Sequence, residues 1–209
     1  RLADYVVTEA GFGADLGAEK FIDIKCRSAG IRPSAAVLVA TIRALKFHGG
    51  VAREDLTQEN LPALRVGLAN LNRHINNLRE NYGGPAVVSI NQLVSETDAE
   101  VELVMEHCKA LGVQVALSSH WAHGGAGATD LAHMVAEICD ADSTPANTPH
   151  DSFVYPNELS LWEKLEAVAT KVYHASEITA NTKVRDRIKE LTDGGYGHLP
   201  VCIAKTPYS

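Results

Sequence analysis

The sequence lacks the features that mark several common classes of protein. Its four cysteines lie far apart and include no C-x-x-C pair, which favours reduced thiols over a disulfide framework or a zinc site. No apolar run reaches the length of a membrane span, and no signal peptide opens the chain. The net charge of -7 supplies no general positive surface for nucleic acids or membranes. We therefore expect a cytoplasmic protein that binds neither nucleic acids nor membranes.

Two common phosphate-binding motifs are also missing. Neither the dinucleotide fingerprint G-x-G-x-x-G nor the P-loop G-x-x-x-x-G-K-[ST] occurs. Without a P-loop lysine, the chain alone is expected to be inactive toward ATP. It begins with Arg1 rather than Met and runs almost at once into an expected strand, so we interpret it as a piece of a longer protein.

A glycine-rich stretch near the N-terminus is the first feature that is present. Residues 5–8 are predicted to form a short buried strand, and three glycines within residues 11–17 allow a tight turn into a helix. Two acids, Glu9 and Asp15, lie at this turn, where the strands of an open α/β sheet deliver functional groups. By itself, the stretch is more typical of an ordinary strand-to-helix turn.

The rest of the chain alternates apolar runs of strand length with amphipathic helices, which predicts an α/β fold with a mainly parallel sheet flanked by helices. The expected strands are 5–8, 35–40 (buried on both faces), 85–90, 113–117 and 199–204. The longest helix carries a stripe of Leu64, Leu68, Leu71, Ile75, Leu78 and Tyr82. A polar loop at 140–149 separates an α/β core segment, 1–145, from a C-terminal helical and strand segment, 146–209.

Two cations follow the expected strand 35–40. Arg43 and Lys46 lie just beyond its carboxyl end, where ligands of α/β proteins bind. The pair either meets an anionic substrate or phosphate, or it is solvated or paired with acids. The sequence favours neither alternative.

A tryptophan in a polar, glycine-rich loop is a second candidate for ligand binding. Loops 11–17, 91–98 and 118–127 follow three expected parallel strands and should share one rim. Trp121 offers a flat apolar face for a heterocycle, although it also suits a role covering the edge of the sheet. His120 and His123 flank it without a third metal ligand, so we expect them to hydrogen-bond the loop or the ligand.

Several long motifs resemble one family. The run T-E-A-G-F-G-A-D-L-G-A-E-K-F at 8–21 resembles the signature of the formate–tetrahydrofolate ligases, also called 10-formyltetrahydrofolate synthetases. The resemblance continues in family order to the last residue. It includes V-A-T-I-R-A-L-K and H-G-G within 39–50, T-D-A-E at 97–100, W-A-H-G-G at 121–125 and G-Y-G-H-L-P-V-C at 195–202.

This resemblance implies a fold, a reaction and partners. The fold is P-loop-NTPase-like, with the ATP-binding loop upstream of this chain and with a small C-terminal α/β appendage that is itself truncated. Formate attacks the γ-phosphate of ATP to give formyl phosphate, and N10 of tetrahydrofolate then attacks the formyl carbon. The family uses Mg2+ with the nucleotide and a monovalent cation, K+ or NH4+, and its members are homotetramers, so we expect a homo-oligomer.

The resemblance also assigns a folate platform. Trp121 occupies the position that stacks on the pterin, next to Gly124 and Gly125. Leu93 stands where the family commonly has an aromatic residue for the other face, and Gln92 replaces a residue that is usually basic. Both departures bear on folate affinity.

The remaining implied residues surround the phosphates. Gly11, Phe12 and Gly13 form the expected formyl-phosphate loop, and Glu9 and Asp15 are the catalytic candidates, which hold a cation or orient the folate amine.

Asn91 and Lys205 are candidates for the nucleotide side, and no residue of this chain is expected to bind a metal by itself. Two other functions remain open. The chain is either a non-catalytic folate- or nucleotide-binding module, or a structural fragment that associates with copies of itself through the stripe on its longest helix.

Overall fold

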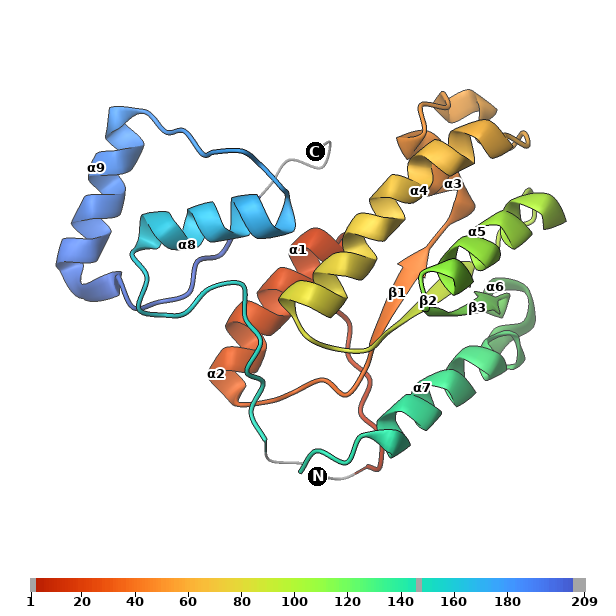
Figure 1. Ribbon diagram of the computed structural model, residues 1–209, viewed down its shortest axis with the longest axis horizontal. Coiled ribbons are helices and arrows are strands. Elements are labelled where there is room, and N and C mark those ends of the chain that lie inside the picture. The colour runs from red at the N-terminus through yellow and green to blue at the C-terminus, as the bar shows by residue number, and fades with distance from the viewer. Residues whose placement is uncertain (1–2, 146–147, 205–209) are drawn as a thin grey trace. The chain divides into compact units, whose positions relative to one another are not determined.

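The chain forms two compact units, each with its own core (Figure 1). The computed structural model describes residues 3–145 and 148–204. One unit is Pro33–Pro145, and the other combines Arg1–Arg32 with Ala146–Ser209. The alternation of strands and helices does not indicate this second grouping, because it joins segments far apart in the sequence.

A three-stranded parallel sheet forms the centre of the Pro33–Pro145 unit, as predicted. The strands are β1 (Ala36–Ala40), β2 (Ala86–Asn91) and β3 (Gln114–Ser118), in the order β1-β2-β3. In the register of the sheet, Ile90 pairs with Ala40 on one side and with Leu117 on the other. The central position of β2 explains why residues 87–90 are all buried, because neighbouring strands and helices remove them from water.

Helices follow each strand of this sheet. They are α3 (Ile42–His48), the short 3-10 helix Arg53–Asp55, α4 (Leu61–Asn76) with its π-helical extension Asn77–Asn81, α5 (Asp98–Ala110), α6 (His120–His123), the 3-10 helix Gly124–Ala128 and α7 (Thr129–Ala141). The side chain of Asn60 caps α4, and Thr97 with Glu100 forms a capping box at α5.

The predicted stripe on α4 and its extension is buried within the unit: Leu64, Leu68, Leu71, Ile75, Leu78 and Tyr82. The stripe is therefore part of the hydrophobic core. It is not the surface through which a structural fragment would associate with copies of itself. A glycine permits the close packing of α4 on α3, since a Cβ at Gly67 would collide with the carbonyl oxygen of Leu45.

A buried ion pair joins α3 to α5. Lys46 Nζ lies 2.8 Å from Glu100 Oε1, and both side chains are almost completely removed from water. Lys46 also donates to the carbonyl oxygen of Gln58 at 2.8 Å. Glu100 accepts from the amides of Asn60 at 3.0 Å and Thr97 at 3.3 Å. Lys46 is thus paired with an acid, one of the alternatives left open by the sequence, whereas Arg43 is exposed.

The edge strand β1 differs from the prediction that both of its faces are buried. Leu38 and Ala40 are buried, but Val39 is 62% exposed and Val37 is also exposed. Burial of both faces requires layers on both sides of the sheet, and the described part of the unit covers only one face of β1.

Two predicted strands are wrong. Residues 5–8 form no strand, and Val7 is 91% exposed. A strand needs a hydrogen-bonded neighbour, and no described segment pairs with this one. Residues 199–204 form no strand either. There the Tyr155 hydroxyl takes the place of a neighbouring strand: it accepts from the amide of Val201 at 3.0 Å and lies 3.4 Å from the carbonyl oxygen of that residue.

The second unit is helical in its described residues. Its N-terminal helix is continuous through α1 (Ala14–Glu19), the π-helical segment Lys20–Cys26 and α2 (Arg27–Ala29), and it ends at Gly30. The C-terminal helices are α8 (Leu161–Ala167) with its extension Val168–Val172, and α9 (Thr182–Leu191) with its extension Thr192–Tyr196. Helix α9 is highly charged and mostly exposed.

Charged residues at intervals of four run along one side of the N-terminal helix and are largely buried. Asp23 accepts from the amide of Val154 at 2.9 Å, and Arg27 donates to the carbonyl oxygen of Tyr155 at 2.7 Å. The carboxyl group of Glu19 is completely buried, and neither of its oxygens has a hydrogen-bond partner among the described residues. Burial, assisted by the charge of Asp23, raises the pKa of Glu19 to about 7.

We predict that Lys46→Met destabilises the protein by about 3–5 kcal/mol, because it leaves the Glu100 carboxylate buried without its cation. Urea unfolding measures this free energy. Arg43→Met is the matched control on the same helix, and it should change the free energy of unfolding by less than about 0.5 kcal/mol because Arg43 is exposed. Equal losses in the two variants would contradict a stabilising role for the buried pair.

We also predict that Glu19→Gln flattens the dependence of stability on pH. The folded pKa of Glu19 is raised from 4.5 to about 7, so between these values the folded protein holds a proton that the unfolded chain has released. The resulting stability is complete below the lower value and is lost as pH rises through the upper one, by on the order of 3 kcal/mol.

Melting temperatures across this pH range measure the effect, with Glu177→Gln as an exposed-acid control in the same unit. The wild type and the control should lose stability as pH rises, and Glu19→Gln should lose less. The loss of stability that remains in Glu19→Gln comes from Asp23, because burial raises the pKa of that carboxyl group to about 6. The same slope in all three proteins would contradict the assignment to Glu19.

Candidate functional site

The carboxyl ends of β2 and β3 form one rim of the sheet. Asn91 pairs with Ser118 in the register, and the next amide, that of Gln92, donates to the carbonyl oxygen of Ser118 at 3.0 Å. Leu93 follows this bonded pair by one residue, and Trp121 follows it by three. The two predicted loops that carry Leu93 and Trp121 therefore begin side by side, where ligands of parallel sheets bind.

The loop after β3 holds its tryptophan in solvent. Trp121 lies in the short helix α6 and is 73% exposed. The amide of Ser119 donates to the carbonyl oxygen of Gly127 at 2.9 Å, and a Cβ at Gly127 would collide with the backbone of Ser119. His123 Nδ1 lies 3.1 Å from Ser119 Oγ, which confirms that this histidine hydrogen-bonds the loop. The loop is closed at its base, and the indole is left exposed to solvent.

The loop after β2 is closed by a glutamate. The amide of Leu93 donates to Glu96 Oε2 at 3.1 Å, and the amide of Glu96 donates back to the carbonyl oxygen of Leu93 at 3.2 Å. Burial raises the pKa of Glu96, while the amides of Leu93 and Ile42 act in the opposite direction. Leu93 itself is half-buried, and its neighbour Val94 is exposed.

Polar side chains lie beneath this rim. Ser89 Oγ and Ser118 Oγ are buried and lie 2.8 Å apart. Asn91 Oδ1 is buried and has no hydrogen-bond partner among the residues described. Because buried polar atoms are nearly always paired, this oxygen is an acceptor available to a ligand's N–H group. Sequence reasoning missed both serines, although a serine inside an apolar strand is the signal that would have found them.

The glycine-rich turn lies in the other unit. Gly13 precedes α1, and its carbonyl oxygen accepts from the amides of Leu16 at 3.0 Å and Gly17 at 2.8 Å. Phe12 is 88% exposed and has a φ of 68°, a left-handed conformation that costs energy for a bulky residue. An anion at this turn would accept hydrogen bonds from the backbone amides that precede Leu16, because the amides of Leu16 and Gly17 already donate to Gly13.

The two acids of this turn have different surroundings. Glu9 is exposed, whereas Asp15 is buried. Burial raises the pKa of the Tyr173 hydroxyl, and the charge and hydrogen bond of Asp15 raise it further, so Asp15 faces Tyr173. Lys205 lies outside the described residues.

The predicted site residues thus form two groups, each within one unit. Asn91, Leu93, Trp121, Gly124 and Gly125 follow β2 and β3 in the Pro33–Pro145 unit. The second group, Glu9, Gly11, Phe12, Gly13 and Asp15, is at the turn before α1.

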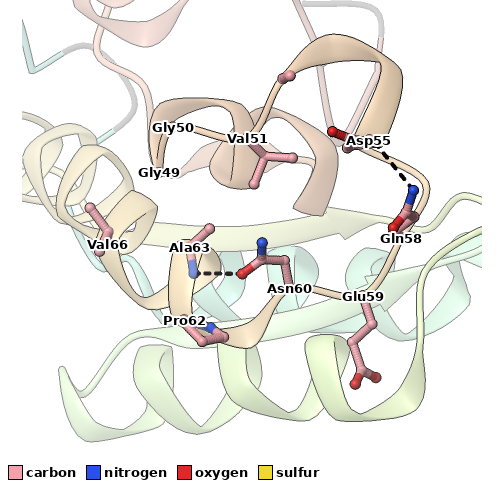
Figure 2. Close-up of a pocket in the computed structure, with 11 residues that line it drawn as sticks. Gly49, Gly50, Val51, Asp55, Gln58, Glu59, Asn60, Pro62, Ala63 and Val66 are labelled. Carbon is pink, nitrogen blue, oxygen red and sulfur yellow. Dashed lines mark hydrogen bonds between the residues drawn. The ribbon is translucent and has the colours of Figure 1, made fainter.

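A hollow of about 720 Å3 lies between the end of α3, the loop that follows and the first turns of α4 (Figure 2). It contains none of the predicted site residues. Its two acids already accept hydrogen bonds, Asp55 from Gln58 at 3.2 Å and Glu59 from the Thr97 hydroxyl at 2.6 Å. The two acids that line the hollow are therefore already engaged in hydrogen bonds within the unit.

Among residues 3–145 and 148–204, no three His, Cys, Asp or Glu side chains are placed to hold a metal ion. No helix in these ranges has both the length and the apolar character that crossing a bilayer requires.

Comparison with known proteins gives one consistent result. Residues 1–209 match the family described as formate–tetrahydrofolate ligase. The chain is 58% identical over 209 residues to the formate–tetrahydrofolate ligase of Methylococcus capsulatus, 54% to that of Granulibacter bethesdensis and 56% to that of Methylibium petroleiphilum.

These alignments include the whole of this chain but only 36%, 36% and 37% of the relatives, so it spans little more than a third of their length. The match of every residue to the family, together with the arrangement of its motifs at the rim and the turn, shows that the chain belongs to the formate–tetrahydrofolate ligase family.

Proposed function

We propose that the full-length protein joins formate to N10 of tetrahydrofolate with ATP, and that this chain supplies the folate platform and part of the formyl-phosphate site. The observation that carries the proposal is Trp121, which is 73% exposed on a closed loop at the carboxyl end of β3. Exposing so large an apolar surface is costly without a ligand, and a flat heterocycle such as a pterin fits it.

The platform has three parts. The indole of Trp121 forms one face, and Leu93 forms an aliphatic contact on the other. Gly124 and Gly125 allow the backbone to approach the ligand. Asn91 Oδ1 lies on the nucleotide side of the rim. There, an amino group on the base of ATP donates a hydrogen bond to this buried oxygen, which has no partner among the described residues.

The glycine-rich turn serves the formyl phosphate. Gly11, Phe12 and Gly13 present backbone amides to the anion, and the strained backbone of Phe12 is the kind of feature that proteins retain at ligand sites. Formate attacks the γ-phosphorus, and ADP leaves. The folate amine then attacks the formyl carbon, and phosphate leaves. The protein's task is mainly to position the reactants and neutralise charge.

The ions and the nucleotide depend on the rest of the protein. The chain has no P-loop, and its described residues offer no three-ligand metal cluster. We therefore assign Mg2+, the monovalent cation and the ATP phosphates to sites completed outside this chain. We also propose that the intact protein is a cytoplasmic homo-oligomer, as the resemblance to its family implies.

We predict that tetrahydrofolate quenches the tryptophan fluorescence of the chain saturably, because the pterin stacks on Trp121. The chain has two tryptophans, so Trp121→Phe should lose the quenching, and the matched control Trp162→Phe should keep it. Saturable quenching that survives Trp121→Phe would contradict the platform.

The same titration of the full-length protein separates the alternatives. Binding seen only in the full-length protein would mean that other segments complete the pocket. Binding by a full-length protein that forms no 10-formyltetrahydrofolate from formate and ATP would identify a non-catalytic folate-binding module.

A further prediction concerns Asp15, which we propose to hold a cation or to orient the folate amine. In the full-length enzyme, Asp15→Asn should lower kcat/KM for at least one substrate by about tenfold or more, a loss of about 1.4 kcal/mol in transition-state stabilisation. Steady-state kinetics measure it, with Tyr173→Phe as the control for the structural contact of Asp15. Unchanged kcat/KM for all three substrates would remove Asp15 from the site.

A further inference from the structure

The turn that carries Leu93 is held by one acidic side chain. Glu96 binds Leu93 twice, once through its carboxylate, which accepts from the Leu93 amide at 3.1 Å, and once through its own amide, which donates to the Leu93 carbonyl oxygen at 3.2 Å. These two contacts determine the path of the backbone at Leu93, and therefore the direction in which its side chain leaves the rim.

The two ends of this loop are anchored independently of Glu96. At the start, the amide of Gln92 is bonded to Ser118 at 3.0 Å. At the end, the hydroxyl of Thr97 donates to Glu59 at 2.6 Å, and its amide donates to Glu100 at 3.3 Å. The cap of α5 therefore does not need the Glu96 side chain, and a change at Glu96 acts mainly on the residues between the two anchors.

The charge of Glu96 is balanced by the groups around it. Burial and the nearby Glu100 carboxylate oppose its ionisation, whereas the amides of Leu93 and Ile42 and the ammonium of Lys46 favour it. The net effect is a raised pKa, so the carboxylate that accepts from Leu93 forms at a higher pH than for an exposed glutamate.

We propose that Glu96 is a positioning residue that sets the affinity for tetrahydrofolate by fixing the backbone of Leu93 opposite the Trp121 loop. The inference rests on the proposed folate platform. Leu93 follows the bonded pair of Gln92 and Ser118 by one residue and Trp121 follows it by three, so the two side chains leave the rim from neighbouring points. A platform that already has its ligand-bound geometry binds tetrahydrofolate more tightly, because less conformational entropy of the loop is lost on binding.

The test is steady-state kinetics of the full-length enzyme and its Glu96→Gln variant. Loss of a charge-assisted hydrogen bond at the platform should raise the KM for tetrahydrofolate by about tenfold. The KM values for ATP and formate, kcat and the melting temperature should stay close to wild type. Glu102→Gln, which removes an exposed acid from α5, is the matched control and should leave the KM for tetrahydrofolate unchanged.

A pH profile gives a readout that a merely structural residue would not change. In the wild type, the KM for tetrahydrofolate should fall as pH rises from mildly acidic to neutral, because the ionised Glu96 carboxylate accepts more strongly from Leu93. Glu96→Gln should remove this component of the profile. Equal KM values and equal profiles in the two proteins would overturn the proposal, as would a rise in the KM for all substrates together with a lower melting temperature.

Trp121→Ala, measured in parallel, separates this inference from the function on which it rests. A raised KM for tetrahydrofolate in Trp121→Ala with no change in Glu96→Gln would overturn the role of Glu96 alone. An unchanged KM for tetrahydrofolate in Trp121→Ala would overturn the folate platform itself, and the role of Glu96 with it.

Discussion

The buried pair of Lys46 and Glu100 is the interaction on which the loops of the Pro33–Pro145 unit depend. A charge removed from water is costly unless it is paired and hydrogen-bonded, so neither side chain can leave the other without a large loss of stability. The pair also binds the carbonyl oxygen of Gln58 and the amides of Asn60 and Thr97. Consequently α3, the start of α4 and the start of α5 meet at one point, although they are far apart in the sequence.

This anchor extends to the rim where we place the folate. Thr97 ends the loop that carries Leu93, and the ladder between β2 and β3 begins it, so the loop is fixed at both ends by parts of the scaffold. Between these ends, Glu96 supplies the remaining constraint. The neighbouring loop is closed at its own base by Ser119 and Gly127, which leaves Trp121 in solvent. A rigid scaffold that presents exposed groups on short, closed loops is the usual arrangement of a ligand site.

In the unit that combines Arg1–Arg32 with Ala146–Ser209, one buried acid is not neutralised by an ion pair. Along its N-terminal helix, Asp23 and Arg27 bind the backbone at 154–155, but the carboxyl group of Glu19 has no hydrogen-bond partner among the described residues. A buried acid without a partner avoids the cost of its charge by holding its proton, which is the physical meaning of its raised pKa. The stability of this unit is therefore tied to pH.

The sequence by itself determined the helices, the parallel class of the sheet and the family. Helix caps such as Asn60 and Thr97 and the stripe on α4 are local patterns, and the family motifs are linear runs of residues. The tertiary structure alone decided which apolar runs form strands, because residues 5–8 and 199–204 have suitable side chains but no neighbouring strand among the residues that the structure describes. It also decided that Lys46 pairs with Glu100 and that Glu96 closes the turn at Leu93. The first of these contacts is set by how distant segments pack, and the second by the path of the loop between β2 and α5, and spacing along the chain encodes neither.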